Sequence, residues 1–257
     1  MNKLLSLNTN MLKILACIFV IIDHIAVYFY NYMTLDIYVS FRIIGRLAMP
    51  VFAYLVVQGF FHTRSINKYV QRLMITGIVT EIIMLTMYTL NKFVFISYQP
   101  SFDVTEINII ITFAVSIIIL KAIDNVIEKK VRKEKIDKKD ILLIAFSCIL
   151  TASYFFVKFD YSYKLLIYMI MLYAIEKVKQ KKNLTKLIYL LLQFVALVIF
   201  VIIYNSEFEY FAVFSIFLLA MYNFERGKKS KIITSVFYAF YPIQHLLLFF
   251  TAMLCSK

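Results

Sequence analysis

Apolar runs of about twenty residues recur along the whole chain, and this feature restricts its fold more than any other. Each run is long enough for a helix to cross the hydrocarbon core of a bilayer. Because hydrocarbon cannot satisfy backbone N–H and C=O groups, such a run must be a helix or a strand of a closed barrel. The alternation of a barrel strand is absent, and 62% of the 257 residues are hydrophobic. The sequence therefore predicts an all-α, polytopic membrane protein.

Nine membrane spans are expected, within a single transmembrane domain over residues 1–257. The predicted spans are 11–30, 39–61, 69–90, 104–122, 141–157, 161–176, 187–204, 208–224 and 232–255. The fifth and sixth spans are short and are joined by "KFDYSYK", so two full crossings and one broken pair are both open. The first run has no small-residue cleavage site, which argues against a removed signal peptide.

The distribution of basic residues predicts the orientation. One side of the predicted topology carries 22 of the 28 Lys and Arg residues, including the charged connection 121–140. Since cytoplasmic connections are enriched in Lys and Arg, the N-terminus is predicted to be cytoplasmic. The connection 121–140 is expected to be a helical extension or a solvated loop. The formal net charge of +13 is then explained by topology and attraction to anionic lipid, and nucleic-acid binding is not expected.

Polar side chains inside the predicted spans are the main functional signal. An Asp, Lys or Arg at a helix centre costs roughly 2.5–3.5 kcal/mol on insertion, so such residues usually face a bundle interior or a wet cavity. Several of them in one chain indicate one shared polar cavity. The residues concerned are Asp23, His24, Arg42, Arg46, Glu81, Asn108 and His245.

His24 is the strongest catalytic candidate in this group. A neutral histidine beside a carboxylate, in a low-dielectric site, is suited to abstracting a proton near pH 7. The predicted chain directions place His24 in the same half of the bilayer as Arg42 and Arg46. Asp23 or Glu81 is therefore expected to pair with Arg46. Ion pairs that only fix helix packing are the alternative interpretation.

Four segments together carry a resemblance to a known family. They are "KILACIFVIIDHI" (13–25), "RIIGRLAMPVFAYLVVQGFFHTRSINKYVQRL" (42–73), "INIIITF" (107–113) and "FYAFYPIQHLLL" (237–248). In this order they resemble the TraX family, bacterial membrane proteins named for N-terminal acetylation of conjugative pilin. The resemblance places the chain in a bacterial plasma membrane as a multi-pass protein.

The TraX family in turn resembles the wider group of transmembrane acyltransferases, which move acetyl from cytoplasmic acetyl-CoA to acceptors at or across the membrane. Many of these have a basic residue, ten intervening residues and a histidine in an early span. Lys13 and His24 have that spacing here.

The resemblance implies an O- or N-acetyltransferase with acetyl-CoA as donor. His24, oriented by Asp23 or a neighbouring backbone group, would be the general base, and Arg46 would stabilise the oxyanion. Glu81 is a fourth catalytic candidate, and a covalent acetyl-histidine stays open. Contacts to substrate are expected from Lys13, Arg42, His62, Arg64, Arg72, Asn108, Thr112 and His245. The three cysteines are isolated, so no metal site is expected.

His245 departs from the family pattern by one position. The closing histidine is expected two residues after Pro242, where this chain has Gln244. A shift of one residue turns a helical side chain by about 100°, which puts the direction of His245 in question.

Two other function classes fit the same buried residues. A secondary transporter or proton-coupled channel also places Asp, His, Arg and Glu at mid-membrane. A non-catalytic membrane component of a conjugation or secretion system is the third class. For the enzyme, the expected partners are the lipid bilayer, acetyl-CoA and a peptide or glycan acceptor. The identity of the acceptor and a homodimer are left open by the sequence.

Overall fold

In the computed structural model, residues 6–94, 105–225, 227–228 and 230–255 are described. Position 104, where one predicted span begins, lies outside the described residues. Three of the 22 basic residues counted above, Lys3, Arg226 and Lys229, also lie outside them. The expected all-α class is confirmed, since the described part of the chain contains helices and no strand longer than a single bridge.

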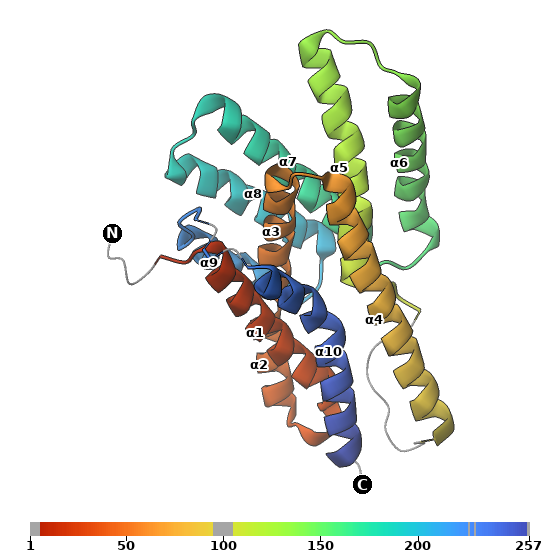
Figure 1. Cartoon of the computed structure of the whole chain (residues 1–257). Coiled ribbons are helices and arrows are strands. Elements are labelled where there is room, and N and C mark those ends of the chain that lie inside the picture. Colours follow the sequence, from red (N-terminus) through yellow and green to blue (C-terminus); the bar gives the residue numbers. More distant parts are fainter. Residues whose placement is uncertain (1–5, 95–104, 226, 229, 256–257) are drawn as a thin grey trace.

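The helices follow one another in the order shown in Figure 1. They are α1 (Thr9–Tyr28), η2 (Tyr30–Tyr32), α2 (Leu35–Gly45), α3 (Ala48–His62), α4 (Ile66–Val94), α5 (Ile109–Arg132), α6 (Lys138–Phe156), α7 (Ser162–Lys182), α8 (Lys186–Tyr204), η3 (Glu209–Phe214), α9 (Ser215–Ala220) and α10 (Lys231–Cys255).

Seven segments of the described chain are long and apolar enough to cross a membrane, so the expected count of nine is not confirmed. They are α1, the pair α2–α3, α4, α5, α6, α8 and α10. In place of the predicted span 161–176 the structure has α7, a separate helix whose lysine-rich end extends to Lys182. It is not among the seven segments. The predicted span 208–224 became η3 and α9, which cover Glu209–Ala220. Six 3₁₀ residues and six α-helical residues extend about 21 Å, less than the hydrocarbon core of about 30 Å.

The second predicted span, 39–61, is broken into α2 and α3. Pro50 lies three residues beyond Leu47, in the first turn of α3. It has no N–H, and its ring would meet the carbonyl of Arg46 four residues earlier, which interrupts the helix. The break places Arg46 between the two helices, where its guanidinium can reach several elements.

α3 is the centre of the bundle (Figure 1). Of its 15 residues, 11 are buried, and it packs against α1, α5, α7 and α9. α10 lies beside α1 and α4, so the two ends of the described chain meet in one wall of the molecule. The backbones at Leu7 and Tyr222 also pair with each other in an isolated β-bridge.

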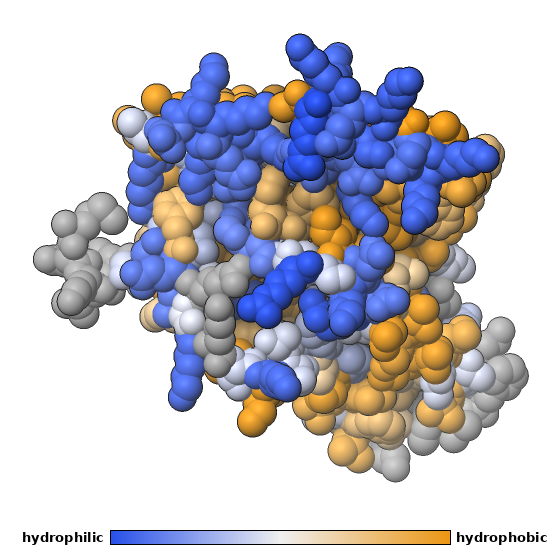
Figure 2. Space-filling model, turned by 45° about the horizontal axis from the view of Figure 1, so that its top comes forward, coloured by the Kyte–Doolittle hydropathy of each residue, from blue (hydrophilic) through white to orange (hydrophobic). Residues whose placement is uncertain are grey.

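α5 continues as a helix to Arg132, which makes most of the predicted polar connection 121–140 helical. A turn and the start of α6 complete it. The charged side chains near this turn are exposed, and hydrophilic side chains gather along the corresponding upper part of Figure 2. α6 exposes large apolar side chains instead, including Leu142, Ile149 and Phe156, as expected for a helix in contact with lipid.

Candidate functional site

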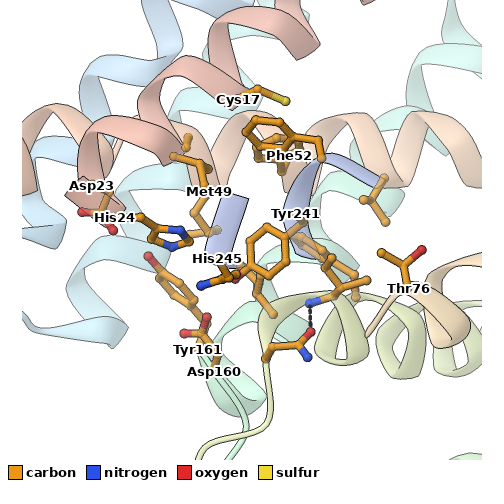
Figure 3. A pocket seen from close by; sticks show the side chains of 18 of the residues that line it. Cys17, Asp23, His24, Met49, Phe52, Thr76, Asp160, Tyr161, Tyr241 and His245 are labelled. Atoms are coloured by element: carbon orange, nitrogen blue, oxygen red, sulfur yellow. Dashed lines mark hydrogen bonds between the residues drawn. The ribbon is translucent and has the colours of Figure 1, made fainter. Parts of the chain in front are cut away.

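An elongated cavity of about 590 Å³ lies between α1, α3, α4 and α10. On α1 it is lined at helical spacing by Lys13, Cys17, Val20, His24 and Val27. At a rise of 1.5 Å per residue, this face is about 21 Å long. A volume of about 590 Å³ spread over this length makes the cavity long and narrow. Figure 3 shows Cys17 toward one end of the cavity, which we name the Lys13 end. The two histidines lie between Cys17 and the opposite end, which we name the Arg46 end.

Asp23 faces two arginines at the Arg46 end. Its Oδ2 lies 3.0 Å from Nη1 of Arg42 and 2.5 Å from Nη2 of Arg46, which confirms the expected pairing of Asp23 with Arg46. Gly45 permits this contact, because a Cβ there would lie 2.3 Å from the Cβ of Asp23. Asp23 therefore holds α1 against α2, and its carboxylate is directed at the arginines rather than at His24.

Arg46 joins four elements through its guanidinium. Its Nη1 donates to the hydroxyl of Tyr161 at 3.0 Å and to Oε2 of Glu209 at 3.4 Å. Its Nε donates to the backbone carbonyl of Arg42. Glu209 is 1% exposed, so this carboxylate is almost completely removed from solvent. A buried cation with a carboxylate on each side is the arrangement that offsets the cost of removing charge from water.

Tyr161 reaches Arg46 from a strained backbone position. Its φ is +58°, in the left-handed region that side chains other than glycine rarely occupy, and Ser162 follows at +49°. The Tyr161 hydroxyl also donates to Glu209 at 3.3 Å. Strain of this kind persists where surrounding contacts enforce it, often at functional sites.

Two carboxylates line the cavity near Tyr161. They are Asp160 and Glu106, brought together because the segments around Ile107 and Phe159 pair through their backbones. The backbone N–H of Asp160 donates to the carbonyl of Ile107 at 2.9 Å. The Arg46 end thus presents both guanidinium and carboxylate groups to the cavity.

His24 and His245 meet in the middle of the cavity wall. α1 supplies the first and α10 the second, and their ring centroids are 4.6 Å apart at an interplanar angle of 38°. Tyr241 lies edge-on to both rings, 5.8 Å from His24 and 4.9 Å from His245. Figure 3 shows the three rings side by side, facing the cavity. The departure from the family pattern at 244–245 therefore places His245 on the cavity, whereas Gln244 is buried away from its lining.

Tyr28 contacts His245 from one turn beyond His24 on α1. Its hydroxyl lies 2.9 Å from Nδ1 of His245, and both side chains are buried. The other ring nitrogen of His245, Nε2, is buried and has no hydrogen-bond partner among the residues that the structure describes, and the same holds for Nδ1 of His24.

Glu81 and Asn108 lie together, and of the two only Asn108 lines the cavity. Oε1 of Glu81 accepts from the backbone N–H of Asn108 at 2.5 Å and from its Nδ2 at 2.8 Å. The side chain of Asn108 caps the start of α5 by accepting from Ile110 and Ile111. Thr112 donates back to the carbonyl of Asn108 and does not line the cavity. The alternative that Glu81 pairs with Arg46 is thus not what the structure shows.

Four of the basic residues expected to contact the substrate are Lys13, His62, Arg64 and Arg72, and of these only Lys13 lines the cavity. The ammonium of Lys13 lies 5.3 Å from the ring centroid of Phe237. Arg72 donates to the hydroxyl of Tyr238 at 3.4 Å, and Tyr238 lines the cavity. His62 and Arg64 are exposed where α3 ends and are not part of the cavity lining.

Six further cavity or ion-pair residues were not singled out from the sequence. They are Tyr28, Glu106, Asp160, Tyr161, Glu209 and Tyr241. The only sequence signal for Asp160 and Tyr161 is the polar connection "KFDYSYK" between two apolar runs. Tyr28 and Glu209 stand at ordinary positions near the ends of apolar runs.

One of the comparisons with known proteins identifies a family. The family model described as TraX protein matches residues 8–252. Over 81 residues the chain is 32% identical to a protein of Dichelobacter nodosus described as "Probable fimbrial assembly protein FimC, serogroup H1". That alignment covers 32% of this chain and 33% of the relative, so the match spans one third of the relative's length. No solved structure matches. With nearly its whole length matched by the family model, the chain belongs to the TraX family.

Proposed function

We propose that this protein is an acyltransferase of the bacterial plasma membrane that moves acetyl from acetyl-CoA to an amine or hydroxyl acceptor. The main support is the position of His24, a histidine in the middle of a long, narrow cavity with Lys13 at one end and both guanidinium and carboxylate groups at the other. Family membership and the similarity to a protein described as involved in fimbrial assembly support an acceptor in a pilus or at the cell surface.

The residues at the Lys13 end fit the donor. Lys13 and Arg72 are cations suited to the phosphates of acetyl-CoA, and the positive-inside rule favours placing this end in the cytoplasm. The cavity beyond Lys13 is narrow, about 21 Å long on α1 and lined mostly by apolar side chains such as Val20 and Phe52, which suits an extended pantetheine arm.

His24 carries the proton in the proposed transfer. It accepts the proton of the acceptor amine or hydroxyl while the acceptor atom forms its bond to the acyl carbon. The carbon–sulfur bond then breaks, and His24 returns the same proton to the sulfur. Acetyl-CoA and acceptor are thereby converted to CoA and acetylated acceptor, with no atom or electron left over.

Arg46 has one N–H group left for the oxyanion. Four hydrogen bonds, to Arg42, Tyr161, Glu209 and Asp23, use four of its five donors. We propose that the remaining Nη2 donor stabilises the negative charge that develops on the acyl oxygen. Asp23 acts in this scheme by holding Arg46 in place.

A non-catalytic membrane component of a pilus or secretion system is the second candidate. The description of the Dichelobacter nodosus relative favours it. This candidate predicts that substitutions in the cavity leave function intact as long as the protein folds. A transporter, the third class, predicts that the cavity residues matter without any release of CoA.

The test is acetyl transfer by the purified protein in lipid vesicles, with labelled acetyl-CoA and candidate peptide and glycan acceptors. Wild type is compared with His24→Ala and with the matched control Ile18→Ala, which changes an exposed residue on the opposite face of α1. Wild type and Ile18→Ala are expected to release CoA and acetylate an acceptor, whereas His24→Ala binds acetyl-CoA without turnover. Absence of acetyl-CoA binding by wild type would reject the enzyme.

The donor end has its own test. Lys13→Met is expected to weaken acetyl-CoA binding by about tenfold, since one charge-assisted contact is lost. Lys138→Met, at the exposed start of α6, is the control and is expected to bind as wild type. Equal binding by both variants would place the phosphates elsewhere.

A further inference from the structure

A histidine that acts as a base needs a group that orients its ring. Asp23 is adjacent to His24 in sequence and was expected to do this. In the structure Arg42 and Arg46 both bind its Oδ2, and its Oδ1, which has no hydrogen-bond partner among the described residues, lies against Gly45 of α2. The orienting group must therefore come from another element.

Two ring nitrogens in the cavity wall have no hydrogen-bond partner in the described part of the chain. They are Nδ1 of His24 and Nε2 of His245, and both are buried. A buried polar atom left unpaired costs about 1–3 kcal/mol, so two such atoms on neighbouring rings call for an explanation.

The two rings are close enough to satisfy each other. Their centroids are 4.6 Å apart. Two imidazoles joined nitrogen to nitrogen have centroids about 5 Å apart, from a hydrogen bond of about 2.9 Å and a ring radius of about 1.1 Å on each side. The torsion that turns a histidine ring has a broad energy minimum. Rotation of the His24 ring about this torsion can bring its Nδ1 toward Nε2 of His245 while His245 keeps its contact with Tyr28.

The contact with Tyr28 allows His245 to hold its proton on Nδ1. Its hydroxyl lies 2.9 Å from Nδ1 of His245, and it can accept a hydrogen bond from an Nδ1–H group. With its proton on Nδ1, His245 presents an unprotonated Nε2 to its neighbour. His24 can then donate its own Nδ1–H to that atom, which leaves Nε2 of His24 unprotonated.

We propose that Tyr28 and His245 are positioning residues for His24, joined to it in a hydrogen-bonded relay in the order Tyr28, His245, His24. This proposal rests on the proposed function, because it states how the base of that reaction is oriented. His245 takes the place of the carboxylate that orients the histidine in a catalytic triad. When Nε2 of His24 accepts the proton of the acceptor, the relay stabilises the resulting imidazolium, and the proton leaves again from the same atom to the sulfur of CoA.

The first test is the tautomer of each ring in the full chain, observed by nitrogen NMR of ¹⁵N-histidine-labelled protein in lipid nanodiscs at mildly alkaline pH. The chain has only three histidines, and the exposed His62 serves as an internal reference. His24 and His245 are both expected to carry the proton on Nδ1. Tyr28→Phe is expected to change the His245 signals, whereas Tyr30→Phe, at an exposed position, leaves them unchanged. A proton found on Nε2 of His245 in wild type overturns the relay.

The second test compares two substitutions of His245. His245→Gln retains an acceptor for His24 and a donor for Tyr28, whereas His245→Leu fills similar space with neither. We expect His245→Leu to lower kcat on the order of 10²-fold and His245→Gln to stay within about tenfold of wild type, with acetyl-CoA binding unchanged in both. Equal losses in the two variants, or no loss in His245→Leu, would show that His245 only packs against its neighbours.

The two tests separate this relay from the proposed reaction. If wild type transfers no acetyl group, the proposed function fails, while the NMR tautomers still decide whether the relay exists. If wild type is active and His245 carries its proton on Nε2, the reaction stands and the relay fails. Thermal unfolding of each variant identifies any substitution that merely disrupts the fold.

Discussion

Glu209 accepts a hydrogen bond from Arg46 at 3.4 Å, although 163 residues separate the two along the chain. Asp23 lies on another side of the same guanidinium, at 2.5 Å. One buried cation thus joins α1, the break between α2 and α3, and η3. Removing one partner of a buried ion pair leaves a charge without compensation, which costs more than the pair itself contributes.

Glu209→Gln tests this relationship. The substitution keeps the size of the side chain and removes its charge, so the free energy of unfolding is expected to fall by about 3 kcal/mol. Glu207→Gln is the matched control, because Glu207 is exposed two residues earlier. Reversible thermal or denaturant unfolding in detergent micelles measures both. Equal stability of the two variants would show that Arg46 does not depend on Glu209.

Gly45→Ala tests the close approach of α1 and α2. The new Cβ would lie 2.3 Å from the Cβ and 2.4 Å from Oδ1 of Asp23, so the two helices must move apart. We expect a loss of about 1–3 kcal/mol in stability and reduced acetyl transfer, since Arg46 would be displaced with α2. Ser40→Ala, on the exposed side of α2, is expected to match wild type. A Gly45→Ala protein with wild-type stability would contradict this packing.

Two substitutions of Glu81 separate anchoring from catalysis. Glu81→Gln keeps the oxygen that accepts from Asn108, so stability is expected to fall by less than about 1 kcal/mol and acetyl transfer to persist. Glu81→Leu leaves the Asn108 donors unpaired and is expected to cost about 1–3 kcal/mol. If Glu81→Gln folds and binds acetyl-CoA but has lost transfer, Glu81 is catalytic, as the sequence suggested.

The start of α6 is expected to respond to acid. Asp137 accepts from the backbone N–H of Asp140 at 2.9 Å, and Lys129 lies 3.1 Å from its carboxylate. The backbone hydrogen bond from Asp140, and then Lys129, lower the pKa of Asp137 from 3.8 to about 2. A depressed pKa gives stability that is complete above the unfolded pKa of about 3.9 and is lost as the pH falls through the folded value.

Hydrogen exchange of the Asp140 amide measures this effect. Its protection is expected to stay constant from neutral pH down to about 4 and then to decrease toward pH of about 2. Asp137→Asn keeps a capping oxygen without a titrating group, so its protection should not depend on pH in that interval. Identical profiles for the two proteins would mean that another group controls this turn.

Sequence reasoning identified part of the site and the pairing of Asp23 with Arg46, but it missed other contacts within the site. Asp23, His24, Arg46 and His245 were all selected because polar groups are costly in hydrocarbon, and all four line the cavity. Glu81 was selected for the same reason, yet it anchors the start of α5. Cost of insertion identifies a polar residue that needs a partner, but it does not say which partner.

The sequence by itself determined the all-helical class, most of the helices, and the family. These depend on the solvent in which each segment lies, because hydrocarbon requires backbone hydrogen bonds to close within the segment. Only the tertiary structure decided that Glu209 balances Arg46, that Asp23 faces α2, and that His245 lies against His24. Such contacts depend on the rotation and depth of helices far apart in the chain, and a turn of about 100° per residue is enough to exchange one partner for another.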